Sequence, residues 1–307
     1  MRLIADVGGT NSRVALSQSG QLLPETARSY SNDNWDSFYA IMTDYLSNND
    51  TSTIEKVVLA VAGPARGDRA HLTNRKWEFE ADKLAQQCGV EDIYLFNDLT
   101  ALGYAVPKLR PDQLRVVTSG AAKQGSTSNS LVVGIGTGFN VSPVWENRGS
   151  VVCPPVEAGH ISMPFSVIKQ LKELGFDQEQ FQTIETLFSG RGFTEYCRKM
   201  TGDAELRGPA AIVAYQAGKS SKTATAIESY ATLLGYLLHD LSLAYMPSSG
   251  IYLAGGVARS IITVSPATCL DTYDQPDSIL AGNTAPLWMI CDDLAALTGC
   301  AQFTPPA

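Results

Sequence analysis

Short apolar stretches that end in glycine-rich turns recur at three places along this chain. The first consists of apolar residues 3–7 and 14–16 around the polar turn Gly8-Gly9-Thr10, and it predicts two strands joined by a tight connection. Residues 131–141 repeat the order of apolar strand, glycine turn and strand, and residues 250–256 run from an apolar strand into Gly255-Gly256. The weak similarity between the first two stretches suggests a duplicated fold.

Helical and strand patterns alternate in the first third of the chain. Residues 57–62 and 93–96 are near-continuous apolar runs, as in strands buried on both faces. Spacings of three and four predict a helix over 32–48, capped by Asn32 or Asp33, and another over 80–88. This alternation predicts an α/β layer architecture with a mainly parallel sheet behind the first hairpin.

The second half of the chain is mostly helical in pattern. Residues 108–129 are polar and rich in Gly, Ser and Gln, which places a domain boundary near them. The helices expected beyond it are 165–174, 178–188, 193–200, 210–217 and a long one within 223–245, with a strand at 287–290 and a helix at 292–297 closing the chain.

Composition and charge narrow the function classes. The 307 residues are 44% hydrophobic and 18% charged, with a net charge of −8, as in a globular protein. The 23 Lys and Arg residues form no basic run, so we expect neither nucleic acid nor a membrane as a main partner. The six cysteines show no paired spacing and predict buried free thiols. Without a signal-like or spanning segment, we expect a cytoplasmic protein.

The first glycine turn carries candidate phosphate chemistry. Glycine lets backbone N–H groups approach an anion closely and form a nest around it. Asp6 precedes the turn and is placed to face a metal ion or its water shell, while Thr10 and Arg13 add a hydroxyl and a cation. An ordinary glycine hairpin with a solvated Asp explains this stretch equally well, because short glycine motifs are common.

Seven short motifs, in this order and spacing, resemble the bacterial glucokinases of the non-zinc type. They are Asp6-Val7-Gly8-Gly9-Thr10-Asn11, Leu72-Thr73-Asn74 with Trp77, Asn97-Asp98 with Thr100-Ala101, Gly136-Thr137-Gly138, Glu157-Ala158-Gly159-His160, Ser189-Gly190 and Leu253-Ala254-Gly255-Gly256-Val257. The zinc-binding cysteine cluster of the related repressor/ORF/kinase proteins is missing. The family belongs to the actin-like, sugar kinase and Hsp70 ATPase superfamily.

The resemblance implies an α/β protein of two ribonuclease-H-like domains with the active site in the cleft between them. Residues 1–108 plus about 290–307 would form a smaller α/β domain with the phosphate hairpin and the catalytic base. Residues 109–289 would form a larger α+β domain with a second phosphate loop, the sugar-binding Glu and His, and the adenosine site. A homodimer is also implied.

The sugar-binding roles follow from the resemblance, residue by residue. Asp98 resembles the base that accepts the proton of the glucose 6-hydroxyl, and Asn97 would bind neighbouring hydroxyls. Glu157 and His160 resemble the pair that clasps the hydroxyls around C1 and C2. Glu185 matches a carboxylate that reaches the anomeric end, and Thr73 and Asn74 would line the same pocket. Simpler interpretations stay open: Asn97 and Asp98 as a helix cap, His160 as a loop residue, and Glu185 as a solvated charge.

The resemblance also assigns an ATP site with Mg²⁺. Gly8, Gly9 and Thr10 would hold the γ-side phosphates, Gly136, Thr137 and Gly138 the opposite side, and Gly255 and Gly256 the adenosine. Asp6 would organise Mg²⁺ through water, because magnesium keeps much of its hydration. Binding, positioning and charge neutralisation are most of what phosphoryl transfer requires.

The chain departs from the family pattern at several positions. Ala158 stands in place of a second glycine, which is tolerated at negative φ and strained otherwise. Asn140 stands where the family often has glycine, and residues 262–285 and 292–294 lack usual features, which affects the adenosine side most. A kinase of another hexose or an amino sugar, a non-catalytic sugar-responsive regulator and an actin-like ATPase are the rival interpretations.

Overall fold

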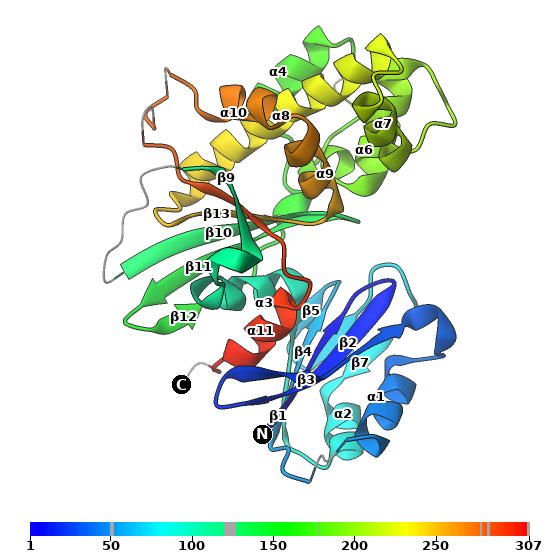
Figure 1. Cartoon of the computed structure of the whole chain (residues 1–307), viewed down its shortest axis with the longest axis vertical. Helices are drawn as coiled ribbons and strands as arrows, with labels where there is room; N and C mark the ends of the chain where they lie inside the picture. Colours follow the sequence, from blue (N-terminus) through cyan, green and yellow to red (C-terminus); the bar gives the residue numbers. More distant parts are fainter. Residues whose placement is uncertain (50–51, 120–126, 178, 277, 281–282, 306–307) are drawn as a thin grey trace. The chain divides into compact units, whose positions relative to one another are not determined.

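A computed structural model describes the chain except for residues 50–51, 120–126, 178, 277, 281–282 and 306–307 (Figure 1). The chain folds into two compact units. Unit 1 consists of Met1–Arg110, Val151–Pro154 and Asp292–Ala307, and unit 2 consists of Pro111–Ser150 and Pro155–Cys291. Most of the segment that the sequence predicts as a polar boundary therefore belongs to unit 2, and 120–126 lie outside the described residues.

Unit 1 is built on a five-stranded sheet with the order β3-β2-β1-β4-β8. Its strands are β1 (Arg2–Val7), β2 (Asn11–Gln18), β3 (Gln21–Ser31), β4 (Lys56–Val61) and β8 (Asp92–Asn97). The pairs β1–β2 and β2–β3 are antiparallel, whereas β1–β4 and β4–β8 are parallel. Behind the first hairpin the sheet is parallel, as predicted, whereas the extension of the hairpin into a third antiparallel strand, β3, was not predicted.

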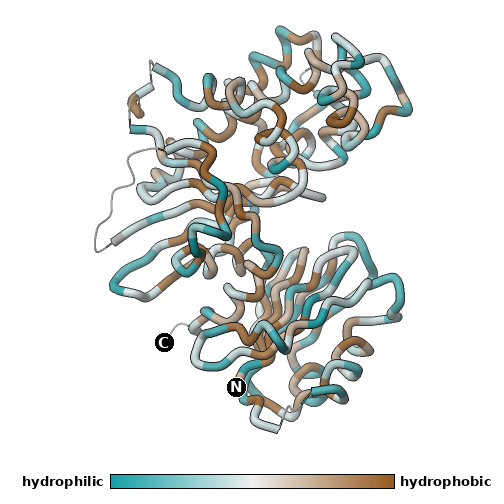
Figure 2. Tube along the Cα trace, viewed as in Figure 1, coloured by the Kyte–Doolittle hydropathy of each residue, from teal (hydrophilic) through white to brown (hydrophobic). Residues whose placement is uncertain are grey.

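Helices cover both faces of this sheet. On one face α1 (Phe38–Ser47) and α2 (Ala81–Cys88) pack on alternate side chains of β1 and β4, which form a buried apolar core. On the other face α3 (Asp98–Ala105) and α11 (Ala295–Gln302) pack against each other and against the strands. The central strands are among the most apolar parts of the unit, as Figure 2 shows. A small sheet of β5 (Ala65–Arg66), β6 (Arg69–His71) and β7 (Glu78–Glu80) completes unit 1.

The side chain of Arg2, in the first strand, binds the C-terminal segment. Arg2 Nη1 donates hydrogen bonds to the carbonyl oxygens of Ala301, at 3.0 Å, and Phe303, at 2.6 Å. The Phe303 ring packs on those of Tyr94 and Phe96, with centroids 5.1 Å apart in both pairs. Residues from both ends of the chain thus stabilise the layer that contains α3.

The first predicted helix begins later than its pattern suggests. A 3-10 turn, η1 (Asn32–Asn34), precedes an extended Trp35, and α1 begins at Phe38. Ser37 is the N-cap, because its Oγ accepts the N–H of Ala40 at 3.3 Å. Asn32 is fully buried and its side chain is bonded to other parts of unit 1, so the prediction of a cap there is wrong.

Unit 2 repeats this strand order in a six-stranded sheet, β12-β11-β10-β13-β14-β9. Its strands are β9 (Leu114–Thr118), β10 (Thr127–Ile135), β11 (Phe139–Asn147), β12 (Ser150–Val152), β13 (Gly250–Ala254) and β14 (Leu287–Ile290). As in unit 1, an antiparallel hairpin is followed by two parallel additions, β13 and β14. The shared order is what a duplicated fold predicts. The edge strand β9 lies in the predicted polar segment and was missed.

Seven helices pack over unit 2's sheet in the described part of the chain. They are α4 (Phe165–Glu173), α5 (Ile184–Leu187), α6 (Gly190–Thr201), α7 (Gly208–Gln216), α8 (Ser221–Tyr245), α9 (Gly256–Val264) and α10 (Pro266–Tyr273). Figure 1 shows them on one side of that sheet, and one buried core joins them to β10 and β13. The helix predicted over 178–188 is confined to α5, because Gln182 and Thr183 pair with an extended segment.

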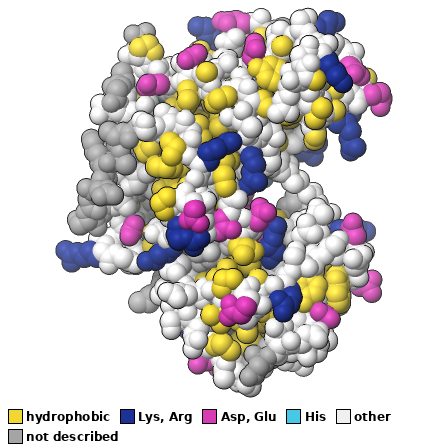
Figure 3. Space-filling view, viewed as in Figure 1, with side chains coloured by type: hydrophobic (Ala, Val, Ile, Leu, Met, Phe, Trp, Pro, Cys, Tyr) yellow, Lys and Arg dark blue, Asp and Glu magenta, His cyan; other side chains and the backbone are white. Residues whose placement is uncertain are grey.

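The predictions of no membrane span, no basic patch and buried cysteines can be compared with the structure. No helix in the described ranges is long and apolar enough to cross a bilayer. On the face drawn in Figure 3, Lys and Arg side chains lie among Asp and Glu side chains. Cys197, Cys269 and Cys300 are buried, as predicted for thiols, but Cys291 is exposed.

Candidate active site

Asp98 lies where strand β8 ends and helix α3 begins. Asn97 is the N-cap of α3, and its Oδ1 accepts the N–H of Leu99 at 2.9 Å. Asp98 Oδ1 accepts the same N–H at 2.9 Å, which uses one of the two carboxylate oxygens. The Asn97 amide also donates to the carbonyl of Gly63 at 3.1 Å. The capping interpretation of this pair is therefore correct, and it fixes the Asp98 carboxylate at the end of a rigid strand.

The environment of Asp98 makes it a base that can act near neutral pH. Burial, together with the negative charge of nearby Asp6, raises the pKa of Asp98 from 3.8 to about 7, although the Leu99 N–H opposes the shift. A general base works best when its pKa is close to the working pH. A carboxyl group that served only as a helix cap would gain no stability from the nearby negative charge of Asp6.

Asp6 is paired with Arg13 across the first hairpin. The two residues are opposite each other in the antiparallel register of β1 and β2, and Arg13 Nη1 lies 3.4 Å from Asp6 Oδ2. The Asp6 side chain is 14% exposed, and burial raises its pKa despite the opposing charge of Arg13. A partly accessible single carboxylate fits a hydrated Mg²⁺, which uses few protein ligands. Among the described residues, no three His, Cys, Asp or Glu side chains form a metal-binding group.

The carbonyl groups of the first glycine hairpin are held from outside the turn. Asn32 Nδ2 donates to the carbonyl of Gly8 at 2.8 Å, and the Asn32 N–H donates to that of Thr10 at 2.8 Å. Arg75 Nε donates to the carbonyl of Gly9 at 2.6 Å. In a trans peptide unit the carbonyl of one residue and the N–H of the next point in opposite directions. The N–H groups of Gly9, Thr10 and Asn11 therefore point away from Asn32 and Arg75. An arrangement of this kind suits an anion.

Asn32 and Arg75 are the residues of this unit that the sequence prediction missed. Asn32 accepts the hydroxyl of Ser12 at 2.8 Å, and Arg75 bonds the Asn32 carbonyl at 3.3 Å and forms an ion pair with Asp33. The Arg75 guanidinium also lies over the Trp77 ring, 5.5 Å from its centroid. The only sequence signal was the position of Arg75 inside the Leu72 to Trp77 motif.

The two other predicted residues of unit 1 lie beside the hairpin region. A Cβ added to Gly9 would stand 3.7 Å from Asn74 Nδ2, so Asn74 flanks the turn, and it is exposed. Thr73 Oγ1 donates to the carbonyl of Ala62 at 3.3 Å and is also exposed. Thr10 is exposed at the tip of the turn.

In unit 2, backbone from three glycine motifs meets at one place. The Gly190 N–H donates to the carbonyl of Gly136 at 2.7 Å, and a Cβ on Gly136 would lie 3.7 Å from the Gly255 Cα. Gly255 has φ +93°, and a Cβ there would lie 2.3 Å from the Ile135 carbonyl oxygen, so glycine is required. Helix α6 begins at Gly190 and α9 at Gly256, and helix N-termini favour phosphate. Gly190 was not among the predicted site residues.

Glu185 supports the second phosphate turn from the side. Its Oε2 accepts the N–H of Phe139 at 3.0 Å, and a Cβ on Gly138 would come within 2.6 Å of the same oxygen. Thr137 is exposed at the tip of this turn, and Gly136 N–H donates to the carbonyl of Gly138 at 3.0 Å. Glu185 is therefore bound to the turn rather than being a fully solvated helical charge.

Glu157 is the N-cap of a short 3-10 turn, η4 (Ala158–His160), and His160 is its last residue. Both side chains are exposed, and residues three apart lie on the same side of such a turn. Ala158 is 2% exposed in the core, and its φ is not positive, so its methyl group is accommodated without strain. Gly159 has no such room, because a Cβ would lie 2.3 Å from the Phe139 carbonyl oxygen.

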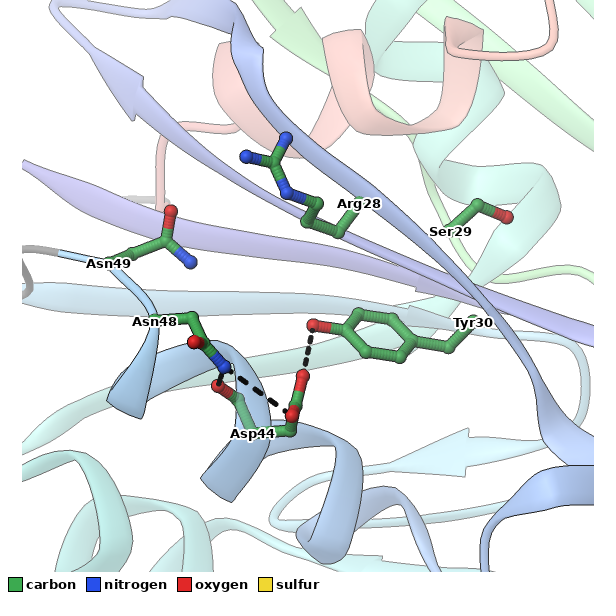
Figure 4. Close-up of a pocket in the computed structure, with 6 residues that line it drawn as sticks. All are labelled: Arg28, Ser29, Tyr30, Asp44, Asn48 and Asn49. Carbon is green, nitrogen blue, oxygen red and sulfur yellow. Dashed lines mark hydrogen bonds between the residues drawn. The ribbon is translucent and has the colours of Figure 1, made fainter.

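A polar surface pocket lies at β3, the edge strand of the unit 1 sheet, and none of the predicted site residues lines it. Arg28, Ser29 and Tyr30 of β3 and Asp44, Asn48 and Asn49 in and after α1 line it (Figure 4). Tyr30 OH donates to Asp44 Oδ2 at 3.0 Å, and Asn48 Nδ2 donates to the Asp44 carbonyl at 2.8 Å. Arg28 Nη1 donates to the carbonyls of Glu25 and Ala27, and we assign the pocket no part in the chemistry.

Comparison with solved structures identifies the same fold elsewhere. A glucokinase from an Antarctic psychrotroph is 25% identical, with a TM-score of 0.81 over 98% of this chain and 97% of that one. A ROK family glucokinase from Streptomyces griseus, solved with glucose and AMPPNP, is 17% identical, with a TM-score of 0.64 over 97% and 98% of the two chains. Both belong to the sugar kinases of the actin-like type, which agrees with the predicted fold class.

Sequence comparison gives the family. A glucokinase from Sinorhizobium medicae is 27% identical over 313 residues, covering 98% of this chain and 91% of the relative. One from Caulobacter sp. strain K31 is 30% identical over 272 residues, covering 85% and 81%. The model of the Glucokinase family matches residues 3–305. The chain therefore belongs to the glucokinase family.

Proposed function

We propose that this chain transfers the γ-phosphoryl group of ATP to the 6-hydroxyl of D-glucose, with Asp98 as the general base. Family membership makes it an ATP-dependent hexose kinase. The observation that supports the role of Asp98 is its environment: a carboxyl group at the end of β8 whose pKa burial and Asp6 raise to about 7. The Streptomyces griseus relative was solved with glucose and an ATP analogue, which supports the same pair of substrates.

The transfer requires one proton acceptor and good positioning. As the glucose O6 forms its bond to the γ-phosphorus, the bond from that phosphorus to the β–γ bridging oxygen breaks and ADP leaves. The proton of the 6-hydroxyl passes to the Asp98 carboxylate. Since the pKa of Asp98 is about 7, the ionised form needed to accept the proton is well populated at neutral pH.

The remaining residues bind and orient the two substrates. We assign the sugar hydroxyls to Asn97, Glu157 and His160, with Asn74 and Glu185 at the edges of the sugar site. We assign the phosphates to the Gly8 to Thr10 hairpin and the Gly136 to Gly138 turn, and the adenosine to Gly255 and Gly256. Asp6 would hold Mg²⁺ through water. The bound ion would neutralise charge on the phosphate oxygens.

A coupled assay of ADP release over a panel of hexoses and amino sugars tests the proposal. We expect glucose-dependent ADP release, with D-mannose, D-galactose and D-glucosamine used less efficiently. A preference for another sugar would show a hexose kinase of different specificity. ADP release that does not depend on any sugar would contradict the proposed function, because an ATPase needs no hydroxyl acceptor.

Assembly and location complete the proposal. The family resemblance supports a homodimer in the cytoplasm, with glucose and ATP as its small-molecule partners. Light scattering at micromolar concentrations would give the mass of the assembly, and the mass of a single chain would contradict the dimer.

A further inference from the structure

The side chain of Asn140 is hydrogen-bonded to three consecutive residues, Val156, Glu157 and Ala158, of which Glu157 belongs to the proposed sugar clasp. It is the second residue of β11, and its Nδ2 donates to the carbonyl of Val156 at 2.7 Å and to Glu157 Oε2 at 3.3 Å. Its Oδ1 accepts the N–H of Ala158 at 2.9 Å and that of Val141 at 2.8 Å. A strand of the unit 2 sheet is thereby tied to the segment that presents Glu157.

These four bonds use the whole hydrogen-bonding capacity of the amide. Asparagine has two N–H donors on nitrogen and two acceptor positions on oxygen. Both acceptor positions are taken by backbone N–H groups, so the nitrogen must be the atom that faces the Val156 carbonyl and the Glu157 carboxylate. The orientation of the amide is therefore fixed, and Asn140 presents a donor to Glu157.

An exposed glutamate needs such a partner to hold one position. Glu157 is exposed, and a free glutamate side chain loses rotamer entropy when it is ordered. The bond from Asn140 removes part of this loss before a ligand arrives and uses only Oε2. The other carboxylate oxygen, Oε1, is left to accept a hydrogen bond from a sugar hydroxyl at the proposed site.

We propose that Asn140 is a positioning residue that holds the Glu157 carboxylate ready for the sugar hydroxyls and so determines the affinity for glucose and the selection against its epimers. This inference rests on the proposed function, which places Glu157 in the sugar site. Asn140 acts through Glu157 and its backbone and touches no substrate itself.

Substitutions at position 140 separate the bonds that the amide oxygen accepts from backbone N–H groups from those that the amide nitrogen donates. Asn140→Ala removes all four bonds, whereas Asn140→Asp keeps an oxygen for the two backbone N–H groups but places a negative charge against Glu157 and the Val156 carbonyl. We expect the KM for glucose to rise about tenfold in Asn140→Ala, as for a lost bond to a charged group, and further in Asn140→Asp. The KM for ATP should stay within about twofold of wild type, because the nucleotide turns are untouched.

The matched control is Asn147→Ala, at the other end of β11, where the side chain is exposed. We expect wild-type kinetics from it. The ratio of kcat/KM for glucose to that for mannose should fall in both Asn140 variants and stay unchanged in the control. Thermal denaturation of each variant identifies any loss of fold. If Asn140→Ala does not fold, Asn140→Asp, which keeps the bonds to the two backbone N–H groups, tests the inference in its place.

A double-mutant cycle with Glu157→Ala provides the decisive result. If Asn140 acts through Glu157, Asn140→Ala should add little to the glucose KM once Glu157 is already alanine. An Asn140→Ala effect that is fully additive, or one that raises the KM for ATP as much as that for glucose, would overturn the inference alone. A wild-type glucose KM in Glu157→Ala would contradict the sugar clasp of the proposed function and the inference with it.

Discussion

Replacing Asp98 by asparagine should strongly lower kcat and at the same time stabilise the folded protein above neutral pH. Asparagine has nearly the same shape and can still accept the N–H of Leu99 through its oxygen, so the cap of α3 is kept. It cannot accept a proton from a hydroxyl, and it carries no charge in its buried position. The two effects therefore have one cause, the environment that raises the pKa of Asp98.

The expected stabilisation follows from that pKa. The folded state raises the pKa of Asp98 from 3.8 to about 7, so it binds the proton more tightly than the unfolded chain does. The ionised carboxylate thus opposes folding increasingly as the pH rises from about 4 to 7, and by about 4 kcal/mol above that range. The Asp98→Asn variant lacks this penalty. We expect its free energy of unfolding to exceed that of wild type by up to about 4 kcal/mol at pH 8, and the difference to shrink as the pH is lowered toward 4.

Denaturant unfolding at several pH values measures the stability, and the coupled assay measures the rate. For wild type, kcat/KM for glucose should fall tenfold per unit of pH below about 7, because only ionised Asp98 accepts a proton. The variant should lose about 10²- to 10⁴-fold in kcat. Asp92→Asn is the matched control, since Asp92 begins the same strand and pairs with Lys56 at 2.8 Å on the surface. Wild-type kcat in Asp98→Asn, or a loss of stability at pH 8, would refute the reasoning.

Two further substitutions test other parts of the structure. Arg75→Ala removes the bond to the Gly9 carbonyl, and we expect the KM for ATP to rise about tenfold with the KM for glucose unchanged, whereas Arg69→Ala, on the neighbouring strand, should leave both constants at wild type. Equal changes in both KM values would argue against the hairpin role. Gly299→Ala would place a Cβ 1.7 Å from the Ala101 carbonyl oxygen, so we expect α11 to be displaced from α3 and the unfolding free energy to fall by about 3 kcal/mol or more, as measured in guanidinium. A wild-type unfolding midpoint would contradict this packing.

Much of the architecture follows from local patterns in the chain. The apolar run at 57–62 becomes β4, which is buried as predicted, because a strand covered on both faces must be apolar along its whole length. The run at 93–96 becomes β8, which lies at the edge of the sheet and is only partly buried, so the prediction of burial on both faces is wrong there. The glycine turns after β1, β10 and β13 were predicted, since tight turns and close backbone approach require glycine. Asp98 at the end of β8 was identified by its motif, but its raised pKa depends on burial and on Asp6, which no local pattern reports.

Other features arise only when distant segments meet. Asn32 looked like a helix cap from its neighbours, yet in the folded unit it is buried against Gly8 and bonds its carbonyl. Arg75 lies 66 residues from Gly9 in sequence and bonds it directly. Asn140 reads as an isolated departure from a glycine motif until its amide is seen to hold Val156, Glu157 and Ala158.

The division has a simple physical origin. Sequence periodicity reports which face of an element is buried, and glycine reports where the backbone must turn or approach another chain segment, so these determined the strands, the turns and the order of the motifs. Hydrogen bonds between side chains and remote backbone groups depend on three-dimensional proximity, which a single sequence does not contain. Only the tertiary structure could therefore decide how the phosphate hairpin is held, what raises the pKa of Asp98, and which residue positions Glu157.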